Sequence, residues 1–276
     1  MSPVVCVGAG TRVAVIGDVA GHLDALQAEL ARLGADPGRA LPPDLVVIQV
    51  GDLVHRGPDS EGVVSLVDGY LENQPDQWVQ LVGNHEAQYL REPAFHWPDR
   101  IARDGVDTLR RWWTSGRMRA AVALVSPAES YLLTHAGVSE PFWRRCLSAP
   151  EDPAEAADRI NKLVGHDDDT LFRAGALLGR DAVAGPVWAS AHAELVPSWL
   201  DHRLPFSQVH GHTSITDWET GRSRADARVG ALTVLDSEAK HETTTLTGGR
   251  IVGVDPCHGE RAQPAWRAWQ PQSSEG

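Results

Sequence analysis

The sequence predicts an α/β fold, and three observations carry that prediction. Apolar runs ending in Gly-Asp or Gly-Asn alternate with helical patterns through the first third of the chain. This βαβαβ order is typical of a parallel sheet with right-handed crossovers. Short β-rich segments separated by turns follow residue 205. The length of 276 residues and the hydrophobic content of 42% suffice for a sizeable core. We therefore expect a single domain over residues 1–276.

The first unit is a strand, an acidic loop and a helix. The run from Arg12 ends in Gly17-Asp18 and reads as a buried strand. Leu23, Leu26 and the leucines that follow have helical spacing up to Gly34, where we expect the helix to end.

Two similar units follow. Residues 45–50 form a second apolar run that ends in Gly51-Asp52, and a helix is expected over about 61–72. The third run, 78–82, ends in Gly83-Asn84-His85-Glu86, which we interpret as a tight loop after a strand.

The middle of the chain is expected to be largely helical. Residues 88–119 have a helical pattern, and two strands over 120–125 and 131–134 follow, the second leading into His135. Residues 140–204 then read as a long, mostly helical insertion. Trp188 and Trp199 lie in it, either as core residues or as surfaces for stacking a base.

The last part is predicted to be β-rich. A strand over 206–209 leads into His210-Gly-His212, and the runs 230–236, 242–247 and 250–254 suggest an antiparallel edge or a second sheet. The tail from about residue 264 is rich in Pro, Gln and Ser, so we expect it to be frayed.

Composition restricts the class of partner. The formal net charge of -12 disfavours a nucleic-acid scaffold or an anionic membrane as partner. The three cysteines are far apart and form no Cys-x-x-Cys pair, which argues against a disulfide framework. We find no N-terminal signal and no apolar run long enough for a membrane span, so we expect a cytoplasmic protein.

Metal-competent side chains follow five of the predicted strands. They are Asp18, Asp52, Asn84, His135 and His212. Each has an ordinary alternative, since Asp18 can cap a helix, Asp52 a loop, and His135 can be a satisfied core histidine. Together, carboxylate, amide and imidazole donors suit Mn, Fe or Zn, and paired ions can hold a phosphate ester and activate water. We therefore predict a metal site at this sheet edge.

The order of these segments resembles the calcineurin-like metallophosphoesterases, nearest the branch of phosphoprotein phosphatases and bacterial diadenosine-tetraphosphate hydrolases. The matching segments run in the family's order from residue 12 to about 215 and are Gly17-Asp-Val-Ala-Gly21, Gly51-Asp-Leu-Val-His-Arg-Gly57, Gly83-Asn-His-Glu86, His135-Ala-Gly137 and Gly211-His-Thr213. The resemblance implies a mixed β-sheet sandwich flanked by helices, with the helical insertion over the active site.

The resemblance also implies a role for each matching residue. Asp52 would bridge two divalent metal ions, Asp18 would bind the first, and Asn84, His135 and His212 would complete the shell of the second. His85 would be the acid that protonates the leaving oxygen. Arg56 would grip the phosphate with its planar donors. Glu86 would support the loop.

The chain departs from the family pattern at the first metal. Ala20 stands where the family has a metal-binding histidine, and a methyl group ligates nothing. His22 or His210 can substitute for it, or can be an ordinary loop or strand-end histidine.

Two further departures concern the chemistry. His55 replaces an aspartate that pairs with the catalytic histidine, which should lower the pKa of His85; His55 is then a proton shuttle or a tolerated loop residue. Ser190 stands where a phosphate-binding arginine is often found.

The resemblance implies hydrolysis of phosphate esters by in-line attack of a metal-held hydroxide. The substrate can be a phosphoprotein, a nucleotide or a small molecule, and nothing in the sequence selects one. The alternative is a binding or regulatory protein that has kept the fold and lost catalysis, to which Ala20, His55 and Ser190 point.

Overall fold

The structure is a computed structural model that describes residues 4–8, 10–36, 40–164, 169–179 and 181–271. Its helices and strands follow one another along the chain in this order: β1 (Val4–Cys6), β2 (Arg12–Ile16), α1 (Leu23–Leu33), β3 (Leu45–Gln49), α2 (Ser60–Asn73), β4 (Trp78–Leu81), α3 (Asn84–Leu90), α4 (Arg103–Thr114), β5 (Met118–Arg119), β6 (Ala121–Val125), β7 (Ser130–Thr134), α5 (Glu140–Cys146), α6 (Pro153–Lys162), the 3-10 turn η1 (Asp169–Phe172), α7 (Gly175–Leu178), the π-helical turn η2 (Ala191–Leu195), α8 (Val196–Trp199), β8 (Ser207–His210), β9 (Thr216–Asp217), β10 (Arg222–Ser223), α9 (Ala227–Leu232), β11 (Thr233–Asp236), β12 (His241–Leu246) and β13 (Gly249–Gly253).

One parallel sheet and one mixed sheet form a sandwich. The described strands β2-β3-β4-β5 pair in parallel in one sheet, and β1-β6-β7-β8-β13-β12-β11 form the other. The second sheet is mixed, because β8 pairs in parallel with β7 and β13, whereas β12 pairs antiparallel with β13 and β11. The predicted fold class, a mixed sandwich flanked by helices, is confirmed.

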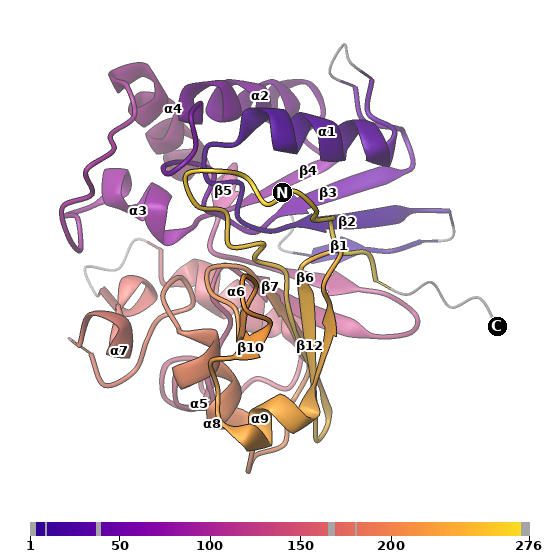
Figure 1. Cartoon of the computed structure of the whole chain (residues 1–276), viewed down its shortest axis with the longest axis vertical. Coiled ribbons are helices and arrows are strands. Elements are labelled where there is room, and N and C mark those ends of the chain that lie inside the picture. The colour runs from indigo at the N-terminus through magenta and orange to yellow at the C-terminus, as the bar shows by residue number, and fades with distance from the viewer. Residues whose placement is uncertain (1–3, 9, 37–39, 165–168, 180, 272–276) are drawn as a thin grey trace.

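The core between the sheets is apolar. Val15, Ile48 and Leu81 of the first sheet pack in one cluster with Leu133 and Val252 of the second, and all are at most 1% exposed. Figure 1 shows α1, α2 and α4 covering the outer side of β2–β4, and the other sheet beneath. This arrangement brings the carboxyl ends of the central strands of both sheets together.

The first two helices have the apolar face and the end signals expected of them. Leu26, Leu30 and Leu33 are the buried apolar face of α1, which ends at Gly34 with φ of 100°. The side chain of Asp59 caps α2 by accepting a hydrogen bond from the Gly62 amide at 2.7 Å.

The region 88–119 is less helical than predicted. Only α3 and α4 are helical, and residues 91–102 between them are irregular. Pro93 and Pro98 fall in this stretch and cannot continue a helix. His85 was expected in a loop but lies in the first turn of α3.

The insertion 140–204 is mostly helical where it is described. α6 packs on β6 and β7, so this part of it supports the sheet. The later part reaches the carboxyl edge of the strands, where the Ala191 amide donates to Thr213 Oγ1 at 2.9 Å.

Two expectations about the C-terminal region were wrong. Residues 227–232 form α9, capped by the Asp226 side chain, so residues 230–232 of the expected strand 230–236 are helical. The tail from about 264 is packed rather than frayed as far as residue 271, because Trp269 exchanges two backbone hydrogen bonds with Val15 and Trp266 is 6% exposed. Residues 272–276 lie outside the described part. Figure 1 shows the yellow segment before residue 272 returning along the sandwich beside β2.

Candidate metal centre

All five predicted metal-competent residues lie at the carboxyl edge of the sandwich. Asp18, Asp52 and Asn84 follow β2, β3 and β4, while His135 and His212 follow β7 and β8. Each is at most 9% exposed. The donor atoms of Asp52, His135 and His212 lie within 4.8 Å of one another. With Asn84, we call these residues the Asp52 cluster.

The contacts inside the Asp52 cluster are short and polar. His135 Nε2 lies 2.9 Å from Asn84 Oδ1 and 3.3 Å from Asp52 Oδ1. His135 Nδ1 donates to the Val50 carbonyl at 2.9 Å, which fixes the ring and directs Nε2 into the cluster. The amide of His85 donates to Asp52 Oδ1 at 3.0 Å and fixes that carboxylate.

The Asp52 cluster fits a divalent cation. His212 Nε2 is buried and has no hydrogen-bond partner, so its lone pair is available to a ligand. Although burial opposes it, the Asp52 carboxylate raises the pKa of His135 to about 9. A proton on His135 therefore balances the charge of Asp52, and a metal ion bound to both would take over that role.

Asp18 stands to one side of this cluster. Its Oδ1 accepts a hydrogen bond from the His212 amide at 2.9 Å, so it is tied to the same edge. Burial, and then the nearby carboxylates of Asp255 and Asp52, raise the pKa of Asp18 well above its ordinary value. The Asp18 side thus gathers acidic groups in a buried place, where a bound cation would stabilise their charged forms.

The candidates for the missing first-metal histidine do not join the Asp52 cluster. Ala20 is 1% exposed and presents only its methyl group. His22 Nε2 lies 2.9 Å from the carbonyl of Gly259, a contact with the C-terminal segment. His210 Nδ1 lies 2.8 Å from the Gly211 carbonyl, and burial lowers the pKa of His210 to about 4.

His85 is oriented toward the Asp52 cluster. Its Nδ1 lies 2.9 Å from the Val54 carbonyl, and its Nε2 lies 3.6 Å from Asp52 Oδ2. The ring of Trp97 covers it, with the ring centroids 4.5 Å apart. The pKa of His85 is lowered, as predicted, but burial is the largest cause and Arg56 adds to it.

His55 belongs to an aromatic group. Its Nε2 lies 2.5 Å from the Tyr89 hydroxyl, and its ring stacks on Trp97 at 5.3 Å. Burial lowers the pKa of His55 to about 4, so it is neutral near pH 7. Val54 O, rather than residue 55, is the hydrogen-bond partner of His85 Nδ1.

Arg56 lies at the edge of the centre, between His258 and Trp97. Its guanidinium donates to the His258 carbonyl at 3.1 Å and lies 5.9 Å from the centroid of the Trp97 ring. It is the cation that acts electrostatically on His85, His212 and Asp255. Glu86 supports the loops as expected, because its carboxylate accepts the amides of Asp52, Leu53 and Gly83 at 2.8–2.9 Å.

Backbone strain is concentrated here. Ala20, Asp52, His55, Arg56 and His212 all have φ between 49° and 74°. Such conformations cost about 1–3 kcal/mol each in a residue other than glycine and persist where the surroundings impose them. The Asp52 carbonyl accepts the amides of both Val19 and Ala20, at 3.0 and 2.8 Å, which links the first two loops.

Asp255 also lies at this edge, although it was not among the predicted residues. This residue follows β13, is 3% exposed, and acts on Asp18 more strongly than Asp52 does. The signal was present in the sequence, because Asp255 follows the apolar run Arg250–Val254 just as Asp18 follows Arg12–Ile16. The segment after it also supplies the contacts to His22 and Arg56.

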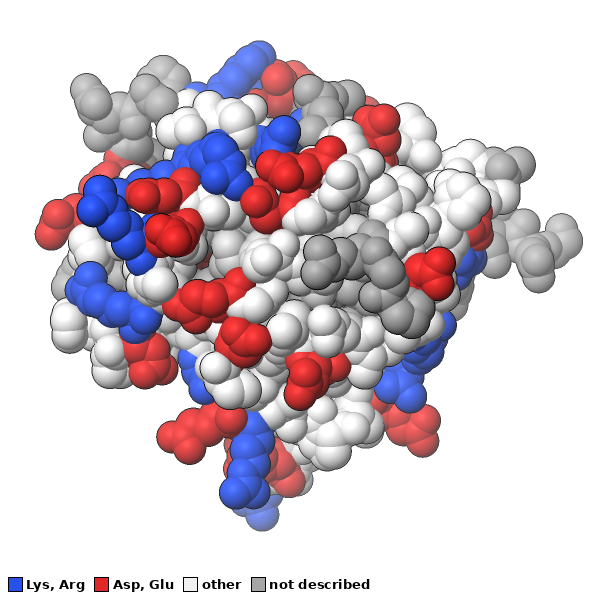
Figure 2. Space-filling model, turned by 90° about the horizontal axis from the view of Figure 1, so that it is seen from above, with Lys and Arg blue, Asp and Glu red and all other residues white. Residues whose placement is uncertain are grey.

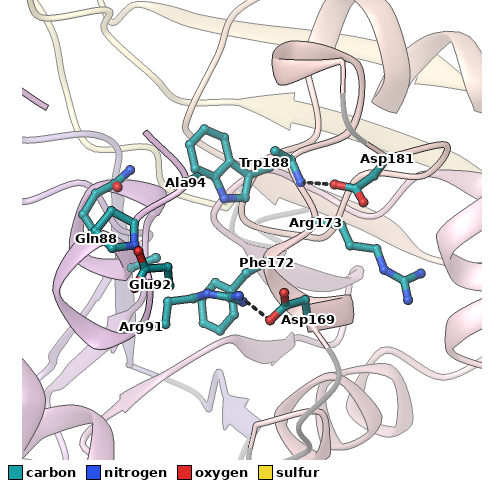
Figure 3. Close-up of a pocket in the computed structure, with 12 residues that line it drawn as sticks. Gln88, Arg91, Glu92, Ala94, Asp169, Phe172, Arg173, Asp181 and Trp188 are labelled. Carbon is teal, nitrogen blue, oxygen red and sulfur yellow. Dashed lines mark hydrogen bonds and ion pairs between the residues drawn. The ribbon is translucent and has the colours of Figure 1, made fainter. Parts of the chain in front are cut away.

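A cavity of about 300 Å³ opens beside the centre. Figure 3 shows Gln88 of α3 and Arg91, which follows this helix, on one side of it and Phe172, Arg173 and Asp181 on the other, with Trp188 also in the lining. Arg91 pairs with Asp169 and lies over the ring of Phe172. Trp188 meets the His212 ring edge-on at 5.9 Å, so the cavity borders the Asp52 cluster.

Trp199 and Ser190, the two other residues of the insertion that were singled out from the sequence, have structural contacts. Trp199 is 1% exposed and donates to the Val138 carbonyl, so it is a core residue. The amide of Ser190 donates to Glu194 Oε2 at 3.0 Å and its hydroxyl lies 3.3 Å from His192 Nδ1.

The fold and the site together define a metal-binding α/β protein with a histidine beside the metal donors. A family model described as calcineurin-like phosphoesterase matches residues 11–226. The chain belongs to the calcineurin-like phosphoesterase family. Family membership and the Asp52 cluster together support metal-dependent hydrolysis of phosphate esters as the general class of activity.

The chain is similar to one known protein in part of its sequence and to several solved structures in fold. The chain is 39% identical over 71 residues to the zinc-dependent endopolyphosphatase of Saccharomyces cerevisiae, a match that covers 26% of this chain and only 19% of that protein. The structure of a cold-active protein-tyrosine phosphatase of a Shewanella species matches with a TM-score of 0.54 and 17% identity, over 92% of this chain and 73% of that one. A protein serine/threonine phosphatase from Saccharomyces cerevisiae matches with a TM-score of 0.51 and 15% identity, over 94% and 73%.

The surface carries charges of both signs. Figure 2 shows Asp and Glu side chains interspersed with Lys and Arg on the face that it presents. Among the described residues, no helix is both long enough and apolar enough to cross a bilayer.

Proposed function

We propose that this chain is a metal-dependent phosphoesterase that uses two divalent ions. The observation that carries the proposal is the convergence of Asp52, Asn84, His135 and His212, with the unpartnered Nε2 of His212 buried among them. Mixed oxygen and nitrogen donors suit Mn, Fe or Zn. The name of the yeast relative favours zinc among these.

We assign each residue the role that the family resemblance implies. Asp52 would bridge the two ions, Asp18 would bind the first, and Asn84, His135 and His212 would bind the second. Bound ions would supply activation of water and neutralisation of the phosphate charge. Arg56, on the rim, would bind the phosphate oxygens with its planar donors.

His85 would protonate the leaving oxygen. Its Nδ1 is held by the Val54 carbonyl, so its Nε2 faces the Asp52 cluster and is the atom that can carry the proton. Its burial under Trp97 keeps bulk water from this ring. A general acid in this position typically contributes about 10²–10⁴-fold to the rate.

The substrate would be a phosphoprotein, a nucleotide or a small phosphate ester. The cavity beside Trp188 would receive the part of the substrate that does not react. We expect the protein to work in the cytoplasm, in keeping with Cys6, Cys146 and Cys257, none of which forms a disulfide.

The test is hydrolysis of p-nitrophenyl phosphate by metal-stripped protein reloaded with manganese, iron or zinc. The wild type should turn over, and the Asp52→Asn variant should show no metal-dependent turnover. Asp107→Asn on the exposed side of α4 is the matched control and should behave as the wild type. Unchanged activity of Asp52→Asn would rule out the bridging role.

A second function is favoured by one observation, the buried methyl of Ala20 where the family has a metal ligand. In this alternative the chain binds a phosphate ester through one ion and does not hydrolyse it. Calorimetry with a phosphate ester and saturating zinc would then show tight binding, while multiple turnovers would eliminate this function.

A further inference from the structure

We propose that Asp255 is a ligand of the first metal ion and takes the place of the histidine missing at position 20. This inference rests on the proposed function, since it concerns the same centre. Its starting point is the location of the segment after β13, which lies against the loop after β2.

The backbone places Asp255 next to Asp18. The loop at Gly17 packs so closely on the end of β13 that a Cβ on Gly17 would lie 2.0 Å from the Val254 carbonyl oxygen. The amide of Val254 donates to the His210 carbonyl at 2.8 Å, which aligns β13 with β8. Asp18 and Asp255 are the next residues on two backbones in direct contact.

The buried carboxylates at this edge favour a cation. Asp18, Asp52 and Asp255 are 2–3% exposed, and a buried carboxylate is costly unless it is paired, protonated or bound to a metal. His135 can balance Asp52, with which it is in contact. For Asp18, the strongest electrostatic neighbour is Asp255, another acid. A divalent ion between them would offset both.

The carboxylate of Asp255 retains capacity for a ligand. Oδ1 accepts the Cys257 amide at 2.7 Å, and Oδ2 lies 3.3 Å from Cys257 Sγ. A carboxylate oxygen has two acceptor positions, so both atoms can accept these contacts and still bind a cation. The unpartnered Nε2 of His212 marks an open ligand position in the adjoining Asp52 cluster, and the amide of the same residue donates to Asp18 at 2.9 Å. The two parts of the centre are therefore joined through His212.

Arg56 offers the competing explanation for Asp255. Its positive charge acts on this carboxylate, so Asp255 could serve only to position Arg56. The guanidinium, however, has a hydrogen bond to the His258 carbonyl rather than one to the carboxylate among those described. The two explanations differ in metal content, which a positioning role would leave unchanged.

The experiment counts zinc ions per chain by elemental analysis after stripped protein is dialysed against zinc. We expect two ions in the wild type and one in Asp255→Asn. Glu260→Gln, in the exposed part of the same segment, is the control and should hold two. Two ions in Asp255→Asn would overturn this inference and leave the proposed function intact. A wild type that binds no zinc would overturn the proposed function, and this inference with it.

A measurement on the wild type keeps the inference testable if Asp255→Asn does not fold. Hydrogen exchange of the amides of residues 255 and 257–259 should slow when zinc is added to the stripped protein, because a metal ion bound to Asp255 restrains this segment. Exchange that slows only around His135 and His212 would overturn the inference.

Discussion

The two halves of the metal centre are built differently. The Asp52 cluster takes its donors from segments that match the family, and each is held by its own local contact, such as that of His135 with the Val50 carbonyl. The Asp18 half has Ala20 where the resemblance implies a histidine, and it meets a segment from the other end of the chain. We call the Asp52 cluster the conventional side of the centre, and the part around Asp18 and Asp255 the rearranged side.

The difference teaches where a lost ligand can be replaced. A residue beside Ala20 in sequence is poorly placed, because His22 is already engaged with the Gly259 carbonyl. A residue distant in sequence can be well placed, because parallel strands bring their carboxyl ends to one edge of the sandwich. Asp255, after β13, is such a residue.

The largest effect should come from His85, which lies on the conventional side. His85→Asn removes the proton donor and leaves the Asp52 cluster in place, so kcat should fall by about 10²–10⁴-fold. Zinc content should stay at the wild-type value. A variant that loses its zinc, or that keeps its kcat, would contradict the assignment of His85 as the acid.

A smaller effect is expected from Glu86, which supports the same side. Glu86→Gln weakens acceptance of the Asp52, Leu53 and Gly83 amides, and zinc affinity should fall by about 10–100-fold. Burial raises the pKa of Glu86 to about 7. At about pH 6 the native side chain is protonated and therefore neutral, like glutamine, whereas at about pH 8 it is charged. The zinc affinity of the variant should therefore differ more from that of the wild type at about pH 8. Isothermal titration with zinc measures this, with Glu92→Gln as an exposed control.

The smallest effect concerns stability on the rearranged side. Burial lowers the pKa of His258 from 6.5 to about 3, so the folded chain holds this histidine neutral. Its contribution to stability is present above the ordinary pKa and is lost as the pH falls from about 6.5 toward 3. Urea unfolding of the stripped protein should show less loss of stability on acidification in His258→Gln than in the wild type.

His202→Gln provides the comparison for this measurement, because His202 is exposed. That variant should lose stability on acidification as the wild type does. An acid dependence that is identical in all three proteins would show that His258 does not contribute.

Much of the fold and the residues of the conventional side, together with Asp18, could be predicted from the sequence. Buried parallel strands leave long apolar runs, and the Gly-Asp or Gly-Asn that ends each is visible, which is why Asp18, Asp52 and Asn84 were identified. Asp255 follows an apolar run in the same way and was overlooked because the resemblance to the family ended near residue 215. Its position after a predicted strand is the feature of the sequence that identifies Asp255.

Other errors came from features that periodicity does not report. Pro93 and Pro98 interrupt the region expected to be helical, although apolar residues continue through it. The strand β1 has only three residues and pairs with β6, which is distant in sequence. Trp269 is ordered by backbone pairing with Val15, which no local pattern in a Pro- and Gln-rich tail predicts.

The most direct test of this account is a titration of the stripped wild type with zinc in which ions per chain and phosphatase turnover are measured on the same samples. If both halves of the centre are needed, turnover should stay near zero up to one ion per chain and rise to its plateau at two. Full turnover at one ion per chain, or none at two, would contradict the account.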